Sequence, residues 1–294
     1  MKKPGKSGKP LIGFIGQGWV GRSYADDFEA RGHAIVRYGL EAPHKDNKAK
    51  IALCDIVFIA VPTPTTPQGF DDSAIRAVLP LVGKGRIAVI KSTLVMGRTK
   101  LLQKAHPDIL LLHSPEFLSE STAAHDAANP HRNIIGIPRK TEAHRKAAEI
   151  VLAVLPKSPY EMICSSDEAE FIKYSHNVHG YIQVVFSNIL YDLAKPFGLD
   201  WETLSEAIKA DPMMSHHRYM NPVHKKGRGA GGHCFIKDFE AFVALTRAAL
   251  PDKKTIAMLE AIRDKNIDLL LGSGKDVDLL EGVYGKAVTA RRLK

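Results

Sequence analysis

The sequence predicts an α/β fold: a Rossmann-type, doubly wound parallel sheet followed by an all-helical domain, with a long helix connecting the two. From Leu11 to about Ile163, short apolar runs alternate with amphipathic stretches, which is the pattern of a parallel sheet with helices on both faces. Beyond Ile163 the pattern is helical only. A glycine-rich turn also separates the first apolar run from the first helical stretch. We therefore expect two domains, residues 1–163 and 164–294.

The predicted sheet has seven candidate strands. Each is a short apolar run, as buried strands of a parallel sheet are. In chain order the runs are LIGFIG, AIVRYG, DIVFIAV, RIAVIKS, ILLLH, NIIGIP and YEMIC. Amphipathic segments lie between several of them, so we expect helical crossovers.

The helical part begins with one long helix over residues 167–195. Asp167 and Glu170 have the spacing of a capping box at its start, and Pro196 and Gly198 end it. A helix of this length usually bridges two domains or packs against its own copy, so we expect a homodimer. Shorter helices are predicted at WETLSEAIKA, DFEAFVALTRAAL and KKTIAMLEAIRDKNIDLLLG. The apolar stripe of the long helix comprises Phe171, Tyr174, Val178, Ile182, Val185, Ile189 and Leu193.

The composition is that of a globular protein with an excess of basic residues. The chain has 294 residues, a net charge of +9 and three scattered cysteines, too few for a disulfide framework. It has no apolar run of about 20 residues and no signal-peptide core, so we expect a cytoplasmic protein without a membrane partner. The charge favours an anionic ligand such as a phosphorylated small molecule. Nucleic acid is not expected, because no basic stripe is interleaved with aromatic residues.

The glycine-rich turn has the GxGxxG spacing of a dinucleotide-binding site. One glycine makes the turn, the next lets a pyrophosphate approach the backbone, and the third lets strand and helix pack closely. We therefore expect NAD. The acidic residue that normally follows about 20 positions later is replaced by Gly39, with Glu41 the nearest carboxylate, and Arg37, His44 and Lys45 leave NADP open. The turn comprises Gly16, Gln17, Gly18, Trp19, Val20 and Gly21.

Hydroxyl-rich segments follow three later strands. They are VPTPTTP (61–67), KST (91–93) and SPEFLSES (114–121). Because ligands of open α/β sheets bind beyond the carboxyl ends of the strands, these segments are candidate site loops.

These stretches, together with three longer ones, resemble the UDP-glucose/GDP-mannose dehydrogenase family. The matching pieces are FIGQGWVG, VPTPT with DDSAI after it, KST, SPEFLSESTAAHDAANPHRNIIG, EFIKYSHNVHGYIQVVFSN and GAGGHCFIKD. Members oxidise C6 of a nucleotide sugar from alcohol to carboxylate with two NAD. A cysteine holds the substrate as a thiohemiacetal and then as a thioester. The resemblance therefore implies NAD as cofactor and a nucleotide-sugar substrate.

The resemblance also implies roles for individual residues. Cys234 is the nucleophile, Lys173 and Asn177 steady the oxyanion, Asp238 positions water, and Glu116 serves thioester hydrolysis. The hydroxyl of Thr93 completes the catalytic set. Cofactor contacts are expected at Gly16, Gln17, Gly18, Trp19, Val20, Gly21, Glu41, Pro62, Thr63, Thr93, Glu120 and Lys237. Substrate contacts are expected at Glu116, Phe117, Leu118, Lys173, Asn177, Gly229, Gly231 and Gly232, and no metal is expected.

The sequence also departs from the family pattern. Family chains continue into a third domain that binds the uridine diphosphate, so we expect a truncated form that lacks this domain, unless a partner chain supplies it. His233 and Ile236 replace the family's Ser and Pro beside Cys234, and Ser121 replaces a glycine. The family's arginine after DP is replaced by Met213 or Met214, with Arg218 the nearest substitute.

Three alternatives remain open. One is a two-domain dehydrogenase of a small hydroxy acid, in which Cys234 has no role. Another is a non-catalytic binding protein derived from a truncated dehydrogenase. The last is a metal site, whose candidate ligands match no standard zinc spacing. These ligands are His216, His217, His224, His233 and Cys234.

Overall fold

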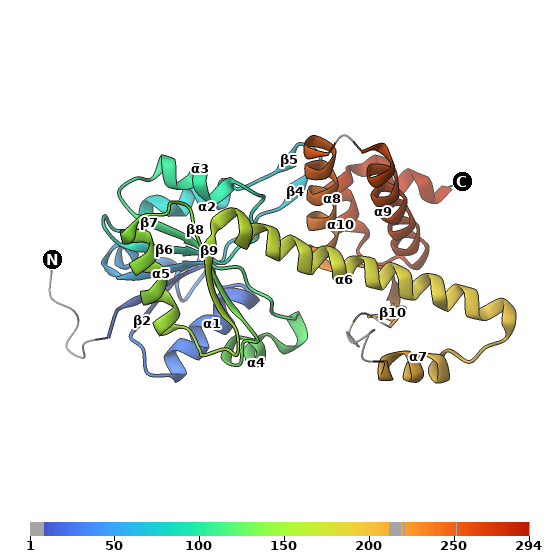
Figure 1. The fold of residues 1–294 in the computed structure, drawn as a ribbon, viewed down its shortest axis with the longest axis horizontal. Helices are drawn as coiled ribbons and strands as arrows, with labels where there is room; N and C mark the ends of the chain where they lie inside the picture. The colour runs from blue at the N-terminus through green and yellow to red at the C-terminus, as the bar shows by residue number, and fades with distance from the viewer. Residues whose placement is uncertain (1–8, 212–218, 220, 251, 294) are drawn as a thin grey trace. The chain divides into compact units, whose positions relative to one another are not determined.

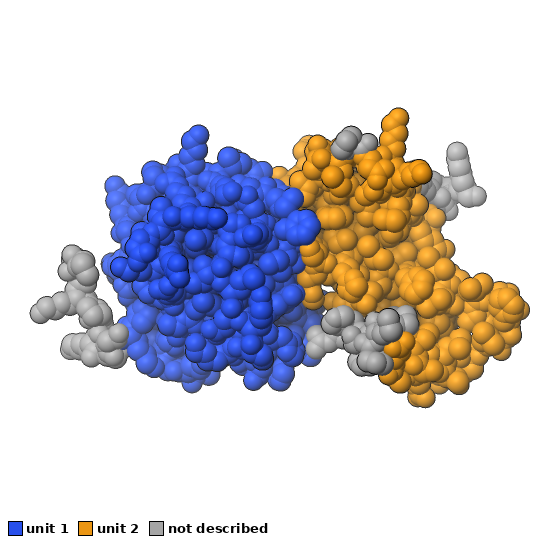
Figure 2. Space-filling view, in the orientation of Figure 1, with its two compact units in different colours: residues 1–63, 71–173 blue, residues 64–70, 174–294 orange. Residues whose placement is uncertain are grey.

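The chain forms two compact units. The computed structural model describes residues 9–211, 219, 221–250 and 252–293. Unit 1 comprises Met1–Thr63 and Asp71–Lys173, and unit 2 comprises Pro64–Phe70 and Tyr174–Lys294 (Figure 2). The boundary predicted at residue 163 lies inside a strand, and the change of unit comes later, after Lys173, inside the long helix.

Unit 1 is built on a seven-stranded sheet with the strand order β2-β1-β3-β6-β7-β8-β9. All seven predicted strands form; the apolar side chains of the inner strands are buried, and those of the edge strands β2 and β9 are mostly half-buried. The pairing is parallel except between β7 and β8, which meet antiparallel at His113 and Gly136. The strands are β1 Ile12–Ile15, β2 Ile35–Tyr38, β3 Ile56–Ile59, β6 Ile87–Ile90, β7 Leu110–His113, β8 Asn133–Ile137 and β9 Glu161–Ser165.

Helices cover the sheet of unit 1 in the doubly wound manner predicted. In Figure 1, α2 and α3 lie on one side of the sheet and α1 and α4 on the other. The core contains stacked and edge-on rings of Phe14, Phe28 and Phe58. The helices are α1 Trp19–Ala30, α2 Ser73–Val78, α3 Arg98–Ala105, α4 Ala123–Ala128 and α5 Glu142–Val154, with 3-10 turns η1 Lys45–Leu53, η2 Leu79–Leu81 and η3 Glu120–Thr122.

Unit 2 is mainly helical, as predicted. The predicted α7 forms as expected, whereas α8 begins several residues before the predicted start and α10 was not predicted. Two short hairpins, β4–β5 and β10–β11, also belong to it. Its elements are β4 Thr65–Thr66, β5 Gly69–Phe70, η4 Lys195–Phe197, α7 Trp201–Ala210, β10 Val223–His224, β11 Gly227–Arg228, α8 Gly232–Ala249, α9 Lys253–Ser273, α10 Val277–Tyr284 and η7 Lys286–Leu293.

The long helix α6, Ser166–Ala194, has a different cap from the one predicted. The capping box is formed by Ser165 and Glu168: the Ser165 Oγ accepts from the Glu168 N–H, and the Glu168 carboxylate accepts from the Ser165 N–H. Glu170 instead points into unit 1 and is fully buried. Its carboxylate accepts from the backbone N–H groups of Gly97 at 2.7 Å and Thr99 at 2.8 Å, at the start of α3.

The predicted apolar stripe of α6 is buried in the middle and exposed towards both ends. Tyr174 and Val185 are buried, whereas Phe171 is 48% and Leu193 56% exposed. Within the described residues, no helix is long and apolar enough to span a membrane.

Candidate active site

The glycine turn between β1 and α1 has the shape that a dinucleotide pyrophosphate requires. A Cβ on Gly16 would lie 2.2 Å from the carbonyl oxygen of Ala60, and one on Gly21 would lie 1.9 Å from that of Gly16. At Gly18, by contrast, no described atom lies within 4 Å of a Cβ. Gly18 is the N-cap of α1 and has no capping side chain, so the helix N-terminus faces this open space. The turn therefore fits the pyrophosphate of NAD.

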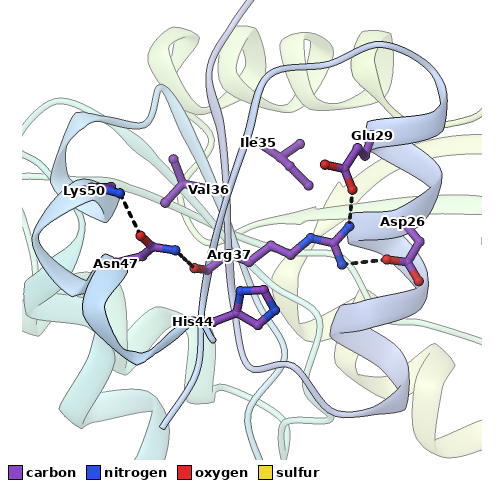
Figure 3. A pocket seen from close by; sticks show the side chains of 8 residues that line it. All are labelled: Asp26, Glu29, Ile35, Val36, Arg37, His44, Asn47 and Lys50. Carbon is purple, nitrogen blue, oxygen red and sulfur yellow. Dashed lines mark hydrogen bonds and ion pairs between the residues drawn. The ribbon is translucent and has the colours of Figure 1, made fainter. Parts of the chain in front are cut away.

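The end of β2 does not provide a phosphate site for NADP. The Arg37 guanidinium is bound by two carboxylates of α1, Asp26 at 2.5 Å and Glu29 at 2.7 Å, beside a hollow of about 520 Å³ (Figure 3). Because the charge of Arg37 is already compensated, a 2′-phosphate would have to displace these partners. Glu41 is exposed, and the Gln17 side chain lies 3.3 Å from where a Cβ of Gly39 would be.

The loops after β3 and β6 are linked by side-chain hydroxyls. Thr63 Oγ1 donates to the carbonyl oxygen of Thr93 at 2.9 Å, and Ser92 Oγ donates to that of Val61 at 2.7 Å. Thr63 and Thr93 are buried, whereas Pro62 is exposed. Two of the expected cofactor residues, Thr63 and Thr93, thus lie together where two neighbouring strands end.

Lys173 and Glu116 form a buried ion pair within unit 1. Lys173 Nζ donates to the Glu116 carbonyl oxygen at 2.6 Å and to Oε1 at 3.0 Å. The other carboxylate oxygen accepts from the Leu118 N–H at 2.7 Å. The Phe117 ring lies 5.5 Å from Lys173 Nζ and 3.8 Å from the Arg132 guanidinium. The structure thus brings the expected residues Glu116, Phe117, Leu118 and Lys173 together, whereas Glu120 is exposed at the start of η3.

Lys91 is a charged group of this cluster that the sequence did not assign. It is 3% exposed, donates to Ser114 Oγ at 3.1 Å and lies 4.2 Å from the centre of the Tyr24 ring. Burial lowers the pKa of Lys91 to about 7; nearby Glu116 opposes this and Lys173 adds to it. The available signal was the KST segment, in which only Thr93 had been given a role.

In unit 2, α8 presents the residues of the cysteine motif. Cys234 lies in the first turn of α8, is partly exposed and forms no disulfide. Lys237 and Asp238 follow three and four residues later and so share a helix face with Cys234. The Asp238 carboxylate is 1% exposed, and it accepts from Asn177 Nδ2 at 2.5 Å and from Lys237 Nζ at 2.6 Å.

A glycine on α6 allows this close contact between α6 and α8. A Cβ on Gly180 would lie 2.9 Å from the Phe235 ring. Asn177 and Gly180 are three residues apart and so lie on one face of α6. That face packs against α8 near Cys234, because Asn177 binds Asp238 and Gly180 lies next to Phe235. Lys173 lies one turn before Asn177 on the same helix, but its partner is Glu116 rather than Asp238.

The other expected residues are placed as follows. Gly229 and Gly232 have positive φ angles of 89° and 79°, and Gly231 is the N-cap of α8. Met213, Met214, Arg218, His216 and His217 lie outside the described residues. Across the part of the chain that is described, no group of three or more metal-ligating side chains occurs.

The remaining cysteines differ from Cys234 in their surroundings. Burial raises the pKa of Cys54 to about 12, with a smaller contribution from Asp55. Burial likewise raises the pKa of Cys164 to about 11, with a contribution from Glu168. Both therefore stay protonated at neutral pH.

Two family profiles match the chain. The NAD binding domain of the UDP-glucose/GDP-mannose dehydrogenase family matches residues 39–153, and its central domain matches residues 167–267. The chain belongs to the UDP-glucose/GDP-mannose dehydrogenase family. Its cofactor is therefore NAD, in agreement with the glycine turn and the compensated Arg37.

Relatives and solved structures agree with this family. UDP-glucose 6-dehydrogenase TuaD of Bacillus subtilis is 26% identical over 257 residues, which cover 83% of this chain and 53% of that protein. The chain thus spans about half the length of this relative. A UDP-glucose dehydrogenase from Pyrobaculum islandicum has the same fold, with a TM-score of 0.75, 24% identity and coverage of 96% of this chain and 72% of that one. A Mycobacterium tuberculosis 3-hydroxyisobutyrate dehydrogenase also has the same fold, with a TM-score of 0.68 and 16% identity. The match covers 96% of this chain and 99% of that one.

Substitutions at Gly18 and Gly21 separate cofactor binding from folding. The Gly18→Ala methyl enters open space at an ordinary φ of −68°, so we expect an unchanged melting temperature and at least about tenfold weaker NAD binding. The Gly21→Ala methyl collides with backbone, so we expect a loss of about 2 kcal/mol of stability. Calorimetric titration and thermal unfolding measure the two effects. Unweakened NAD binding in Gly18→Ala would contradict the assignment of the glycine turn as the pyrophosphate site.

Lys91 makes stability depend on pH. Its pKa is about 7 in the folded protein and near 10.4 in an unfolded chain, so the unfolded chain binds more protons between these values. The free energy of unfolding therefore rises with pH in this window, by about 2 kcal/mol between pH 7 and pH 9. Urea unfolding at these pH values should show that Lys91→Met abolishes this rise and that Lys104→Met, at an exposed position, keeps it. The same rise in the free energy of unfolding in both variants would refute its attribution to Lys91.

Proposed function

We propose that the protein oxidises the C6 alcohol of a nucleotide sugar to the carboxylate in two hydride transfers, with Cys234 as the nucleophile. The observation that carries the proposal is the order of contacts along α6. Lys173 binds Glu116, Asn177 one turn later binds Asp238, and Asp238 shares a face of α8 with Cys234. These are the residue types that such a reaction requires.

The electrons and atoms of the proposed reaction balance. Loss of one hydride and one proton converts the alcohol to an aldehyde. The Cys234 thiolate adds to the aldehyde carbon, and the oxygen takes up a proton to give a thiohemiacetal. Loss of a second hydride together with that proton gives a thioester. Water then cleaves the thioester to the carboxylate and restores the thiol. NAD, when bound at the glycine turn, supplies the acceptor for each hydride.

Each polar residue has a role that suits its contacts. Asn177 Nδ2 carries two N–H bonds, so it can hold Asp238 and still donate to a substrate oxygen. The Lys173 ammonium, buried beside Glu116, stabilises an oxyanion more strongly than it would in water. Glu116 and Asp238, both buried carboxylates, are the candidates to orient the water that cleaves the thioester.

The alternative is a single hydride transfer from a small hydroxy acid. The observation that favours it is the match to the 3-hydroxyisobutyrate dehydrogenase structure, which this chain covers over 99% of its length. That likeness concerns the fold alone. A single hydride transfer uses neither a thiol nor a carboxylate for thioester hydrolysis, so the two functions differ in stoichiometry.

Stoichiometry tests the proposal. The protein is incubated with NAD and a panel of UDP- and GDP-sugars, and NADH is measured per sugar consumed. We expect two NADH per sugar with the native chain and with Cys164→Ser, and no four-electron turnover with Cys234→Ser. One NADH per sugar in all three proteins would favour the hydroxy-acid alternative, and none with any sugar would favour a non-catalytic binding protein.

We also propose that the partner of this chain is a second copy, bound through the C-terminal half of α6. Phe186, Ile189 and Leu193 are 47%, 43% and 56% exposed and lie three and four residues apart, so they form one apolar stripe. We expect a dimer at micromolar concentration in sedimentation equilibrium, and Ile189→Glu with Leu193→Glu should give a monomer. A monomeric native protein at that concentration would contradict the proposed dimer. Exposed Ile150→Glu on α5 is the matched control.

A further inference from the structure

The glycine loop that precedes Cys234 is held along its backbone by one segment of unit 2, residues 266–276. Asn266 Oδ1 accepts from the Ala230 N–H at 2.6 Å, and Asn266 Nδ2 donates to the Ala230 carbonyl oxygen at 3.0 Å. Ser273 Oγ accepts from the Arg228 N–H at 2.9 Å. Side chains far along the chain thus replace the backbone partners that a glycine-rich loop lacks.

The same segment continues its contacts up to the first residue of α8. Lys275 Nζ donates to the Gly229 carbonyl oxygen at 2.9 Å. Asp276 Oδ2 accepts from the Gly232 N–H at 2.7 Å, and a Cβ on Gly231 would lie 2.0 Å from that oxygen. The carboxylate therefore occupies space that only a glycine at this position leaves open.

Asp276 itself has a strained backbone. Its φ of 52° and ψ of 35° place it in the left-handed region, which non-glycine residues seldom adopt. Such a conformation persists only where the surrounding contacts hold it. The contact that the structure gives its side chain is the one to the start of α8.

This contact has a chemical consequence for Cys234. The first N–H groups of a helix lack intrahelical acceptors and stabilise a nearby anion, such as a thiolate two residues into α8. A carboxylate bound at the same helix start has the opposite effect, because it repels a second negative charge. Asp276 thus binds the first N–H of α8, the helix that carries Cys234 two residues later.

We propose that residues 266–276, called the clamp below, position Cys234 and that Asp276 adjusts its reactivity: the hydrogen bond to Gly232 fixes the start of α8, and the carboxylate charge sets how readily the thiol ionises. The catalytic meaning of this positioning depends on the proposed role of Cys234. The structural claim does not depend on it, since it concerns the reactivity of the thiol towards any electrophile.

Alkylation of Cys234 by iodoacetamide tests the charge effect. The rate is followed by mass spectrometry of the Cys234 peptide from pH 5 to pH 10, in the full chain. In Asp276→Asn the amide oxygen can still accept from Gly232 but the charge is gone, so the pH of half-maximal rate should fall by about half a unit. Asp278→Asn removes an exposed charge two residues further on, and its midpoint should equal that of the native chain. Equal midpoints in the two variants would overturn the proposal.

Amide hydrogen exchange tests the positioning. Asn266→Ala and Ser273→Ala should each speed exchange of residues 228–235 at least about fivefold and leave the strands of unit 1 unchanged. Neither substitution removes a charge, so neither should lower the alkylation midpoint as Asp276→Asn does. Unchanged exchange in both variants would refute the clamp, whatever the alkylation rates show.

These measurements separate the present inference from the proposed function. Neither alkylation nor exchange requires turnover. A lowered midpoint in Asp276→Asn without NADH formation from any sugar would support the clamp and reject the dehydrogenase reaction. Two NADH per sugar, together with an unchanged alkylation midpoint in Asp276→Asn and unchanged exchange in Ser273→Ala, would support the dehydrogenase reaction and reject the clamp.

Discussion

The structure depends on a buried charge, the ammonium of Lys173. Its side chain is 3% exposed, and a buried ammonium costs several kcal/mol unless a partner compensates it. Glu116 provides that compensation through both its carbonyl oxygen and its carboxylate, so the loop after β7 must contact α6. Glu170, three residues earlier, ties the same helix to the start of α3. The first turns of α6 are therefore fixed to unit 1 by polar contacts, before the helix continues into unit 2.

Lys91 is a second buried lysine near Glu116, and its burial is energetically unfavourable. Two buried lysines, Lys91 and Lys173, lie near one carboxylate, Glu116, and burial lowers the pKa of Lys91 to about 7. Loss of the Lys91 proton relieves repulsion of Lys173. Natural proteins usually avoid such a lysine, because an apolar side chain would be more stable there. Its presence beside Glu116 makes this a buried polar cluster rather than an ordinary apolar core.

The sequence predicted what is periodic or local and missed what depends on distant partners. The seven strands were predictable because buried parallel strands are continuous apolar runs, and α6 because its stripe repeats at helical spacing. The antiparallel pairing of β7 with β8 was not, since no strand encodes the direction of its neighbour. The start of α8 was missed because glycines such as Gly232 predict a loop, although the Gly232 N–H is satisfied by Asp276, 44 residues away. Asn266 and Asp276 are likewise defined by long-range contacts that leave no pattern in the sequence.

The three cysteines show why placement matters more than residue type. Cys54 and Cys164 are held as thiols by burial, which raises their pKa values to about 12 and 11. Cys234 instead lies at the start of a helix, on the same face as Asp238, behind a loop that four side chains hold in place. An enzyme that transfers one hydride from a hydroxy acid has no chemical use for such a thiol. The contacts of residues 266–276 with the loop before α8 thus give the proposed role of Cys234 a structural counterpart that Cys54 and Cys164 lack.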